Sequence, residues 1–429
     1  MKLLFVCFEY YGKMDAGSRC IQHLRTELLR QMVQSDVLTY DWAGKAPQII
    51  KDTSGTVYTA KTWYRYARLH RNNAGKIQMS PLQWAKAAVT RGYAILTEGK
   101  NYAHRGVPVN STYSLQKRLA SLCTTNKYDW IISVSYPFSN HLAVLKACPS
   151  ECKIALYNLD PYWNNLTYDS RDRISRAKEE VAAYKKANLV FCTPEQLSDY
   201  QNDFFSEVRQ KITPLNYPNF VPPCIEQAAS IQFDPEKINL LFLGTIYSDI
   251  RKPDALFQLF EQVSQLEPRL HLYVIGKKFG ENADRYLVEY QSKMKDRLTV
   301  CSPVPPEETA DLMRQADILV NLGNTMHNQM PSKLLEYIAT GKPILNISAR
   351  EDCNTLSLMN RYPLGLQIFS TEPFQKERTE DFLRFCANAK KRVLTWEELE
   401  TLYEKQLLSA VCSGFLNALS ASAKGDNHE

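Results

Sequence analysis

The chain has 429 residues, of which 44% are hydrophobic and 23% are charged, with a formal net charge of +6. This length is too great for one hydrophobic core, so we expect two domains in an ordinary globular protein. No apolar run approaches the roughly 20 residues that span a bilayer. Met1 leads directly into KLLFVCF, a strand-like run without a signal-peptide cleavage site, so we expect a cytoplasmic protein.

The eleven cysteines show no metal-binding or catalytic pattern. The closest pair, Cys148 and Cys152, has no second pair and no nearby His to complete a ligand set. In a strand, as at Cys7, a thiol behaves as a small hydrophobe. We therefore expect all of them to be reduced and none to be catalytic.

Short apolar runs alternate with amphipathic helical patterns through the first half of the chain. The expected strands are 2–8, 35–40, 129–135, 153–158, 188–193 and 211–215. The expected helices are 17–33, 114–124, 138–147 and 171–186. Strands that alternate with helices form a parallel sheet with right-handed crossovers.

The second half repeats this alternation. Its expected strands are 238–244, 271–276, 298–302, 317–323, 343–348 and 366–369, and its expected helices are 253–266, 282–294, 307–315 and 331–340. Two such series predict an α/β protein with two Rossmann-like, doubly wound parallel sheets. Parallel sheets bind ligands at the carboxyl ends of their strands, so two facing sheets would form one cleft with a site from each side.

The break between the domains is expected in NYPNFVPPC (216–224), where three prolines interrupt the periodicity. The expected N-terminal domain is 1–220, with an insertion at about 45–112, and the expected C-terminal domain is 225–395. The stretch 396–429 begins as a helix with no strand after it, and we expect it to cross back to the first domain.

The positive charge is concentrated in residues 61–118. This stretch carries eleven Lys or Arg and one acid, Glu98, so its charge is +10 and −4 remains for the rest of the chain. Aromatic residues are interleaved with the cations. The pattern suits an anionic membrane surface, at about 1 kcal/mol per nearby basic residue, and equally suits a solvated helical insertion. Nucleic-acid binding is not expected, because no recognition motif accompanies the charge.

One strand–helix junction of the second half has the residues of an anion site. Gly244 and Thr245 follow a strand, and Arg251 and Lys252 stand just before the next helix. Backbone N–H groups at a helix start, together with two cations, form a cradle for a diphosphate. A solvated basic turn is an equal alternative.

The segment MPSKLLEYIATGKPIL (330–345) carries one carboxylate, Glu336, off the apolar stripe of its predicted helix. The N–H groups of Ser332 and Lys333 at the helix start are aimed at anions. Glu336, one turn further along, can accept hydrogen bonds from vicinal hydroxyls such as those of a ribose. The plain alternative is a solvated Glu paired with Lys333. A phosphate cradle and a ribose acceptor together describe a nucleotide-diphosphate sugar.

The sequence resembles the retaining glycosyltransferases of the GT-B fold, family 4 or glycosyl transferases group 1, which includes sucrose synthases and lipopolysaccharide mannosyltransferases. The matching segments are KKANLVFCTPEQLSDY, KITPLNYPNFV, INLLFLG…RKPDAL, HLYVIGKK, VPPEETADLMRQADILVNLG and MPSKLLEYIATGKPIL. The resemblance covers nearly all the chain except about 45–112. It implies transfer of a sugar from a nucleotide-diphosphate donor to a glycan or lipid-linked acceptor, in cell-surface polysaccharide synthesis at the inner face of the membrane.

Residue by residue, the resemblance places Glu336 at the donor ribose. Asn328 stands where the family has a Glu near the transferred sugar, and an amide cannot stabilise a developing cation as that carboxylate would. Pro331 stands where the family has a glycine, which removes one backbone contact to phosphate. Arg251 and Lys252 match the family's Arg/Lys pair in kind.

The resemblance also assigns roles in the first domain. There the first strand–helix loop closes over the donor phosphates, which implicates Gly17 and Arg19. A His or Asp often follows a later strand in the family, and Asp160 is the candidate that orients or deprotonates the acceptor hydroxyl. An Asx-turn before Pro161 is an equal alternative for Asp160. His141 is expected to be structural.

The expected catalytic residues are therefore Asp160 and Asn328, without a protein nucleophile. No cofactor and no metal are expected, because no DxD tripeptide occurs in a strand-end loop and the cations can neutralise the leaving diphosphate. A nucleotide-sugar epimerase on the same fold, and a binding or scaffold protein without catalysis, are the alternatives.

Overall fold

The computed structural model describes residues 1–429 except 12–14, 42–46, 62–111 apart from a few single positions, 167, 169, 248–249, 252, 280–282, 371–375 and 426–429. The chain divides into two compact units, and each is described by itself. Unit 1 comprises Met1–Pro218 and Leu408–Glu429, and unit 2 comprises Asn219–Leu407.

Unit 1 is built on a sheet of buried apolar strands. Its described residues form eight strands in the order β3-β4-β2-β1-β5-β6-β7-β8, parallel except for the β3–β4 pair. The strands are β1 (Lys2–Cys7), β2 (Gln34–Asp41), β3 (Ile49–Asp52), β4 (Gly55–Lys61), β5 (Trp130–Ser135), β6 (Lys153–Asn158), β7 (Leu189–Cys192) and β8 (Ile212–Pro214). The chain order reverses between β1 and β5, which is the switch point where doubly wound sheets bind ligands.

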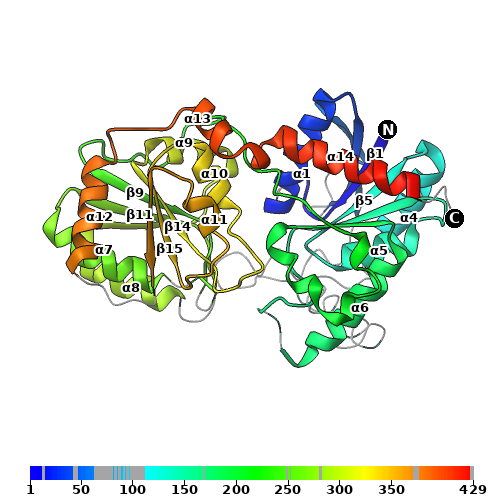
Figure 1. Cartoon of the computed structure of the whole chain (residues 1–429), viewed down its shortest axis with the longest axis horizontal. Helices are drawn as coiled ribbons and strands as arrows, with labels where there is room; N and C mark the ends of the chain where they lie inside the picture. Colours follow the sequence, from blue (N-terminus) through cyan, green and yellow to red (C-terminus); the bar gives the residue numbers. More distant parts are fainter. Residues whose placement is uncertain are drawn as a thin grey trace. The chain divides into compact units, whose positions relative to one another are not determined.

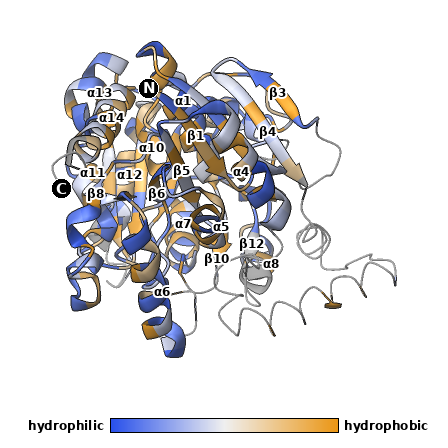
Figure 2. Cartoon of the chain, turned by 90° about the vertical axis from the view of Figure 1, so that its right-hand side faces the viewer, coloured by the Kyte–Doolittle hydropathy of each residue, from blue (hydrophilic) through white to orange (hydrophobic). Residues whose placement is uncertain are grey.

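Helices cover both faces of this sheet (Figure 1). They are α1 (Ala16–Arg30), α4 (Tyr113–Asn126), α5 (Ser139–Ala147), α6 (Arg173–Lys186) and α14 (Leu408–Gly425). Helix α1 packs on α14, while α5 packs on both α4 and α6. Figure 2 shows β1 in hydrophobic colours and α6 largely in hydrophilic ones, as expected for a buried strand and a half-exposed helix.

The expected insertion begins with a hairpin that belongs to the sheet. Strands β3 and β4 pair across the turn at Ser54, and β4 extends the sheet next to β2. Arg25 of α1, which is fully buried, holds this edge with a 2.5 Å ion pair to Asp52 and a 2.6 Å hydrogen bond to Tyr10. The sheet therefore takes in residues 49–61, and most of 62–111 lies outside the described residues.

Unit 2 has a second parallel sheet. Its described residues form six strands in the order β13-β11-β9-β14-β15-β16, and β10 and β12 pair separately. The strands are β9 (Ile238–Leu243), β10 (Ile246–Tyr247), β11 (Leu270–Ile275), β12 (Lys278–Phe279), β13 (Leu298–Cys301), β14 (Ile318–Leu322), β15 (Ile344–Ser348) and β16 (Gly365–Phe369). Counted along the chain, the six-stranded order is 3-2-1-4-5-6, that of dinucleotide-binding sheets. The prediction of two doubly wound Rossmann-like sheets is confirmed.

Helices also cover both faces of the second sheet (Figure 1). They are α7 (Asp254–Leu266), α8 (Ala283–Met294), α9 (Thr309–Gln315), α10 (Lys333–Ala339), α11 (Leu356–Met359), α12 (Lys376–Asn388) and α13 (Trp396–Leu402). Helix α7 packs against α8 and α12, whereas α10 packs against β14 and α13. The core of unit 2 lies between these layers and the sheet, as that of unit 1 does.

The single helical stretch expected from 396 onward is broken in two. Trp396 in α13 stacks on Phe220 with ring centroids 5.1 Å apart, so this helix is anchored within unit 2. A 3-10 turn at Glu404–Gln406 ends that packing, and Leu407 bridges back to Phe220. Helix α14 then packs in unit 1, where Phe415 lies 5.0 Å from Phe191. Residues 396–407 thus belong to unit 2, and the returning helix begins at Leu408.

Candidate functional site

Two glycines lie at the carboxyl edge of the unit 2 sheet, beside the switch point between β9 and β14. Gly244 follows β9 and Gly276 follows the neighbouring strand β11, and a Cβ on Gly276 would lie 1.7 Å from the carbonyl oxygen of Gly244. The N–H of Gly244 donates to the carbonyl of Ile275 at 3.0 Å. The two strand ends therefore meet more closely than any side chain permits. Thr245 comes next and is half-exposed.

Arg251 crosses this switch point. Its Nε and Nη2 donate to Oδ1 of Asn324 at 3.0 and 2.8 Å, and the N–H of Thr325 donates to the carbonyl of Ile250 at 2.8 Å. These bonds join the loop after β9 to the loop after β14. Burial lowers the pKa of Arg251, but an arginine stays charged in a protein. The bonds to Asn324 use two of the five N–H donors of the guanidinium, so a fixed and partly exposed cation stands at the switch point.

Tyr337 of α10 lies close to Arg251 and Glu336, the two charged residues assigned to this edge. Its buried hydroxyl accepts the N–H of Leu243 at 2.9 Å and lies 3.3 Å from the carbonyl of the same residue. Burial raises the pKa of Tyr337, while Glu336 raises it further and Arg251 lowers it. Arg251 and Glu336, which the sequence assigned to one donor site, are therefore both near this phenol.

Glu336 is half-buried and paired. Its Oε2 accepts a 2.5 Å bond from Lys333 Nζ, and its Oε1 accepts from Asn219 Nδ2 at 3.1 Å. The side chains of Lys333 and Glu336 are 25% and 17% exposed. The ion pair that the sequence offered as the plain alternative is thus present, and a ribose here would share the carboxylate with Lys333. Asn219 is a new member of the site, and only its place in the predicted linker pointed to it.

The loop before α10 differs from its expected form. The helix begins at Lys333 rather than 331, and Ser332 is its N-cap residue without a side-chain capping bond. Asn328, expected near the transferred sugar, has a fully buried side chain. Because the protein encloses this amide, a direct contact with a sugar would require the loop to rearrange.

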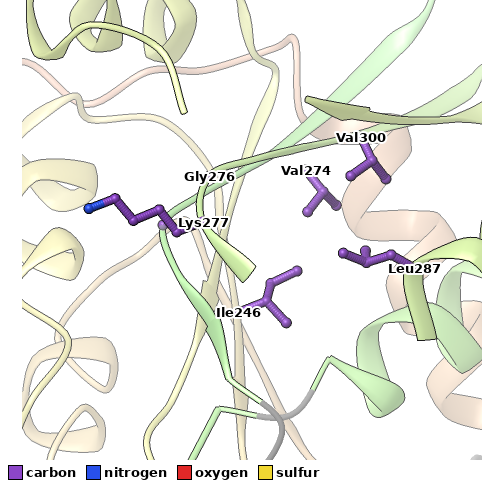
Figure 3. A pocket seen from close by; sticks show the side chains of 7 residues that line it. Ile246, Val274, Gly276, Lys277, Leu287 and Val300 are labelled. Carbon is purple, nitrogen blue, oxygen red and sulfur yellow. The ribbon is translucent and has the colours of Figure 1, made fainter. Parts of the chain in front are cut away.

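A small hollow lies behind the two glycines. It is too tight to hold a water molecule, and its lining is Gly244, Ile246, Val274, Gly276, Lys277, Leu287 and Val300. Figure 3 shows the aliphatic side chains turned toward one another, whereas the Lys277 side chain points away. The hollow is apolar and separate from the paired charges of the edge.

In unit 1 the structure brings together the start of α1 and the loop after β6. A Cβ on Gly17 would lie 3.2 Å from a methyl of Leu159, the residue before Asp160. Asp15 caps the helix by accepting the N–H of Ser18 at 2.7 Å, and Arg19 in the first turn is partly exposed. Asp160 is partly exposed as well. Gly17, Arg19 and Asp160 therefore lie along one edge of this unit.

His141 is part of the core. Its Nδ1 lies 2.8 Å from Ser133 Oγ and its Nε2 lies 2.9 Å from Asn158 Oδ1. Burial lowers its pKa to about 4, so the imidazole is neutral at pH 7. Asn158 ends β6, two residues before Asp160, and its Nδ2 donates to Tyr184 at 2.6 Å.

A buried carboxylate that the sequence analysis did not single out continues this network. Glu180 of α6 accepts bonds from Tyr184 and, at 3.0 Å each, from the Tyr200 hydroxyl and the N–H of Trp163. Burial raises the pKa of Glu180 to about 7. Because Trp163 follows Asp160 closely, the network holds the loop that carries the candidate acceptor-side residue. The signal in the sequence was a Glu at helical spacing from Ala177 and Tyr184, on the buried stripe of α6.

Two expectations lie outside the described residues. Lys252, the second cation of the proposed cradle, is one of them, and most of the basic stretch 61–118 is another. At its described end, Arg118 lies over the ring of Tyr58, 5.6 Å from the centroid. Among the helices that the structure describes, none is sufficiently long and apolar to cross a membrane.

Solved structures match this chain over nearly its whole length. Sucrose-phosphate synthase from Thermosynechococcus elongatus aligns with a TM-score of 0.64 at 13% identity, over 98% of this chain and 99% of that chain. HepE from Anabaena, in complex with UDP-glucose, aligns with a TM-score of 0.56 at 11% identity, over 98% and 100%. TarM from S. aureus, in complex with UDP, aligns with a TM-score of 0.59 at 12% identity, over 97% and 99%. The chain has the GT-B fold.

Within this GT-B chain, residues 237–355 match the family model described as Glycosyl transferases group 1. The match begins at β9 and includes Gly244, Arg251, Asn324 and Glu336. A search of curated protein sequences finds no match. The resemblance drawn from the sequence is confirmed, for the fold over the whole chain and for group 1 within unit 2.

Proposed function

We propose that this GT-B protein transfers a sugar from a nucleotide-diphosphate donor to a hydroxyl of a glycan or lipid-linked acceptor. The observation that carries the proposal is the Arg251–Asn324 pair, which joins two loops at the switch point of unit 2. A guanidinium held in this way can bind phosphate oxygens through its remaining donors. The group 1 match includes both loops.

Both positively and negatively charged side chains bind the donor in this proposal. Arg251, with Lys252 and Lys333, neutralises the diphosphate as it departs, which is the main electrostatic contribution to the transfer. Glu336 accepts hydrogen bonds from the ribose hydroxyls once Lys333 turns toward phosphate. Transfer of a hexosyl group from a UDP-sugar with retention is the form we propose, since HepE and TarM were solved with UDP-glucose and UDP.

The acceptor side is assigned to unit 1. Asp160 orients or deprotonates the acceptor hydroxyl, and Gly17 and Arg19 at the start of α1 contribute to donor binding. Asn328 donates and accepts hydrogen bonds near the transferred sugar once the loop before α10 rearranges. The reaction proposed for these residues uses no metal and no further cofactor.

The proposed setting is cell-surface polysaccharide synthesis in the cytoplasm, at the inner face of the membrane. The support is the charge of +10 in residues 61–118, interleaved with aromatic residues. Flotation with liposomes that contain anionic lipid tests this part separately. We expect binding that weakens with salt, and a protein that stays with the soluble fraction at low salt would overturn it.

Calorimetry with UDP, GDP and ADP, followed by a turnover assay with the matching sugar nucleotides, tests the donor site. Arg251→Ala is expected to weaken binding of the preferred nucleotide by about 10- to 100-fold, because charged hydrogen bonds contribute about 1.5–3 kcal/mol. Glu336→Ala is expected to abolish most turnover while the protein stays folded. Arg269→Ala and Glu267→Ala are matched controls, because these residues pair with each other just before β11, at the opposite end of the sheet.

Full activity in either site variant would overturn the assignment of that residue. Nucleotide binding without turnover would favour a protein that has lost catalysis, and the buried Asn328 is the observation that makes this the second candidate. Incubation with the donor alone separates the epimerase alternative, because an epimerase changes the sugar without an acceptor.

A further inference from the structure

The loop that follows β6 in unit 1 is buried except at one residue. From Asn158 to Asn164 every residue is buried apart from Asp160, which is partly exposed. The start of the loop therefore offers one side chain to a ligand at the carboxyl edge of the sheet. Asp160 is also the residue to which the proposed function assigns the acceptor hydroxyl.

Hydrogen bonds from other segments hold this loop on both sides of Asp160. Before it, the Tyr217 hydroxyl donates to the carbonyl of Leu159 at 3.1 Å. After it, Nδ2 of Asn164 donates to Oδ1 of Asp199 at 2.7 Å. These partners come from the segments after β8 and after β7, so three parts of the chain meet at the loop. The backbone around Asp160 is fixed by bonds that its own side chain does not make.

One turn of α6 supplies the partners of both backbone groups of Trp163. The Trp163 N–H donates to Oε2 of Glu180 at 3.0 Å, and its carbonyl accepts from Nε and Nη2 of Arg176 at 3.4 and 3.3 Å. Arg176 and Glu180 are four residues apart, so they lie on the same face of the helix. Both are enclosed by the protein, with 1% and 0% of their surface exposed. We call these two side chains the α6 clamp.

Glu180 also reaches the start of the loop. Its Oε1 accepts a bond from the Tyr184 hydroxyl, and that hydroxyl accepts from Nδ2 of Asn158 at 2.6 Å. Asn158 ends β6 two residues before Asp160. The carboxylate is therefore bonded to the loop directly after Asp160 and, through one phenol, directly before it.

A buried carboxylate is an expensive way to pack a loop. Burial raises the pKa of Glu180 to about 7, because the charged form loses its hydration. An apolar side chain of similar volume would fill the same space without this cost. Hydrogen bonds, however, have a preferred length and direction, so they fix the position of a backbone more closely than apolar contacts do. The arrangement indicates that the exact position of the loop matters.

We propose that Arg176 and Glu180 are positioning residues for sugar transfer, which hold Asp160 where it meets the acceptor hydroxyl. The inference rests on the proposed function, in which Asp160 orients or deprotonates that hydroxyl. A reacting group that is displaced by about 1 Å can lose about 100-fold in rate. The α6 clamp acts through Asp160 alone, because neither of its side chains is exposed to a ligand.

Turnover and donor binding are measured first in the unaltered protein. Absence of transfer with every sugar nucleotide would overturn the proposed function itself, before any variant is made. Glu180→Met keeps the volume of the side chain and removes both acceptor oxygens. Its kcat is expected to fall about 10- to 100-fold. Its affinity for the donor nucleotide, measured by calorimetry, is expected to stay unchanged, and thermal unfolding shows that it is folded.

Two further variants of the α6 clamp sharpen this test. Arg176→Met leaves the carboxylate in place, and a smaller loss of kcat is expected because its two bonds to the Trp163 carbonyl are long. Glu180→Gln is expected to restore most of the turnover, because its amide oxygen still accepts the Trp163 N–H and its NH₂ group can donate to the neighbouring phenol oxygens.

Ala183→Gly is the control for a general loss of stability. Ala183 is buried on the same helix, and glycine is a poor helix former, so the variant is expected to unfold at a lower temperature. It removes no bond to the loop, so its kcat is expected to equal that of the unaltered protein.

A double variant shows whether Glu180 acts through Asp160. In an Asp160→Ala background, Glu180→Met is expected to cause no further loss of kcat, because the residue that it positions is already absent. Hydrogen–deuterium exchange of residues 158–165 gives a readout that is independent of activity. The Trp163 amide is expected to exchange faster in Glu180→Met than in the unaltered protein, since its acceptor is gone.

Three results would overturn the positioning role while the proposed function stands. They are full turnover in Glu180→Met, an equal loss of kcat from Glu180→Met with and without Asp160, and unchanged exchange of the Trp163 amide. A loss of kcat in Ala183→Gly as large as that in Glu180→Met would also overturn it, because instability alone would then explain the effect.

Discussion

Both units are built on a doubly wound parallel sheet, but the carboxyl edges of the two sheets carry different kinds of polar group. In unit 2 the edge presents Arg251, Lys333 and Glu336, all partly exposed. In unit 1 His141 and Glu180 near that edge are buried and bonded to neighbouring side chains. The charged side chains of this edge are thus accessible to a ligand in unit 2, whereas the buried polar side chains of unit 1 hold a loop in place.

The prediction with the largest expected effect concerns the close approach of two strand ends in unit 2. Gly276→Ala places a methyl group 1.7 Å from the Gly244 carbonyl, so the strand ends must separate. We expect a loss of more than about 3 kcal/mol of unfolding free energy, together with loss of nucleotide binding. Urea unfolding and calorimetry measure the two quantities.

Gly414→Ala is the matched control, because the nearest atom to its new methyl is 3.5 Å away, in ordinary contact. It lies inside α14, where alanine is favoured over glycine by about 0.5–1 kcal/mol, so a small gain in stability is expected. Equal stability of the two variants would mean that the strand ends of unit 2 are not rigidly packed.

The second prediction concerns the buried imidazole of unit 1. The folded pKa of His141 is about 4, below its ordinary value of 6.5, so the unfolded chain binds more protons between these two pH values. Its contribution to stability is complete above pH 6.5 and is lost as the pH falls toward 4, by on the order of 3 kcal/mol. His141→Gln is expected to remove this part of the acid sensitivity in urea unfolding at pH 7, 5.5 and 4.5.

The titration of Glu180 changes stability in the opposite direction over this pH range. The unfolding free energy of His141→Gln is therefore compared with that of the unaltered protein at each pH. Its folded pKa of about 7 lies above 4.5, and its contribution therefore falls as the pH rises from 4.5 to 7. If His141→Gln and the unaltered protein lost stability in parallel on acidification, the imidazole would not be the titrating group.

The third prediction tests whether the donor edge of unit 2 depends on orientation as well as charge. Asn324→Ala keeps Arg251 but removes the oxygen that fixes its guanidinium. We expect about 10-fold weaker nucleotide binding, since one hydrogen bond to a charged group is worth about 1.5–3 kcal/mol. Asn360→Ala, at an exposed position after α11, is the control. Unchanged affinity in Asn324→Ala would mean that Arg251 does not have to be held by Asn324 in order to bind the nucleotide.

The smallest effect is expected for the half-exposed ion pair on α10. Lys333→Met removes the partner of Glu336, and stability should change by less than about 1 kcal/mol, as for other surface pairs. If Lys333 turns to the phosphate of the bound nucleotide, affinity should fall about 3-fold in this variant. That change corresponds to a loss of less than about 1 kcal/mol of binding free energy. Lys293→Met, which breaks the exposed pair with Glu289 in α8, should change neither quantity measurably.

The sequence was sufficient for most of the fold because buried parallel strands are continuous apolar runs. Strands such as β1 and β9 could be recognised in this way, and so could the alternation that predicts doubly wound sheets. The hairpin of β3 and β4 was assigned to the insertion because IIKDTSGTVYTAK is an edge hairpin with few large apolar residues. The pairing of β4 with β2 and the ion pair of Asp52 with buried Arg25 place it in the sheet.

Only those residues of the candidate site that belong to a local sequence pattern could be predicted. Arg251 stood out as a cation before a helix, and Glu336 as a carboxylate outside an apolar stripe. Asn219 and Asn324, which contact these two residues, come from other parts of the chain and have no pattern of their own. Contacts between distant segments depend on packing that no local periodicity records.

The return of the chain into unit 1 has a consequence for biosynthesis. Phe415 of α14 lies 6.0 Å from Phe5 and 5.0 Å from Phe191, so the last helix covers strands that leave the ribosome long before it. Unit 2 is one continuous segment and can be completed while the nascent first unit still lacks this cover. The apolar face of β1 and β7 then remains open to chaperones until α14 has been synthesised and docks on these strands.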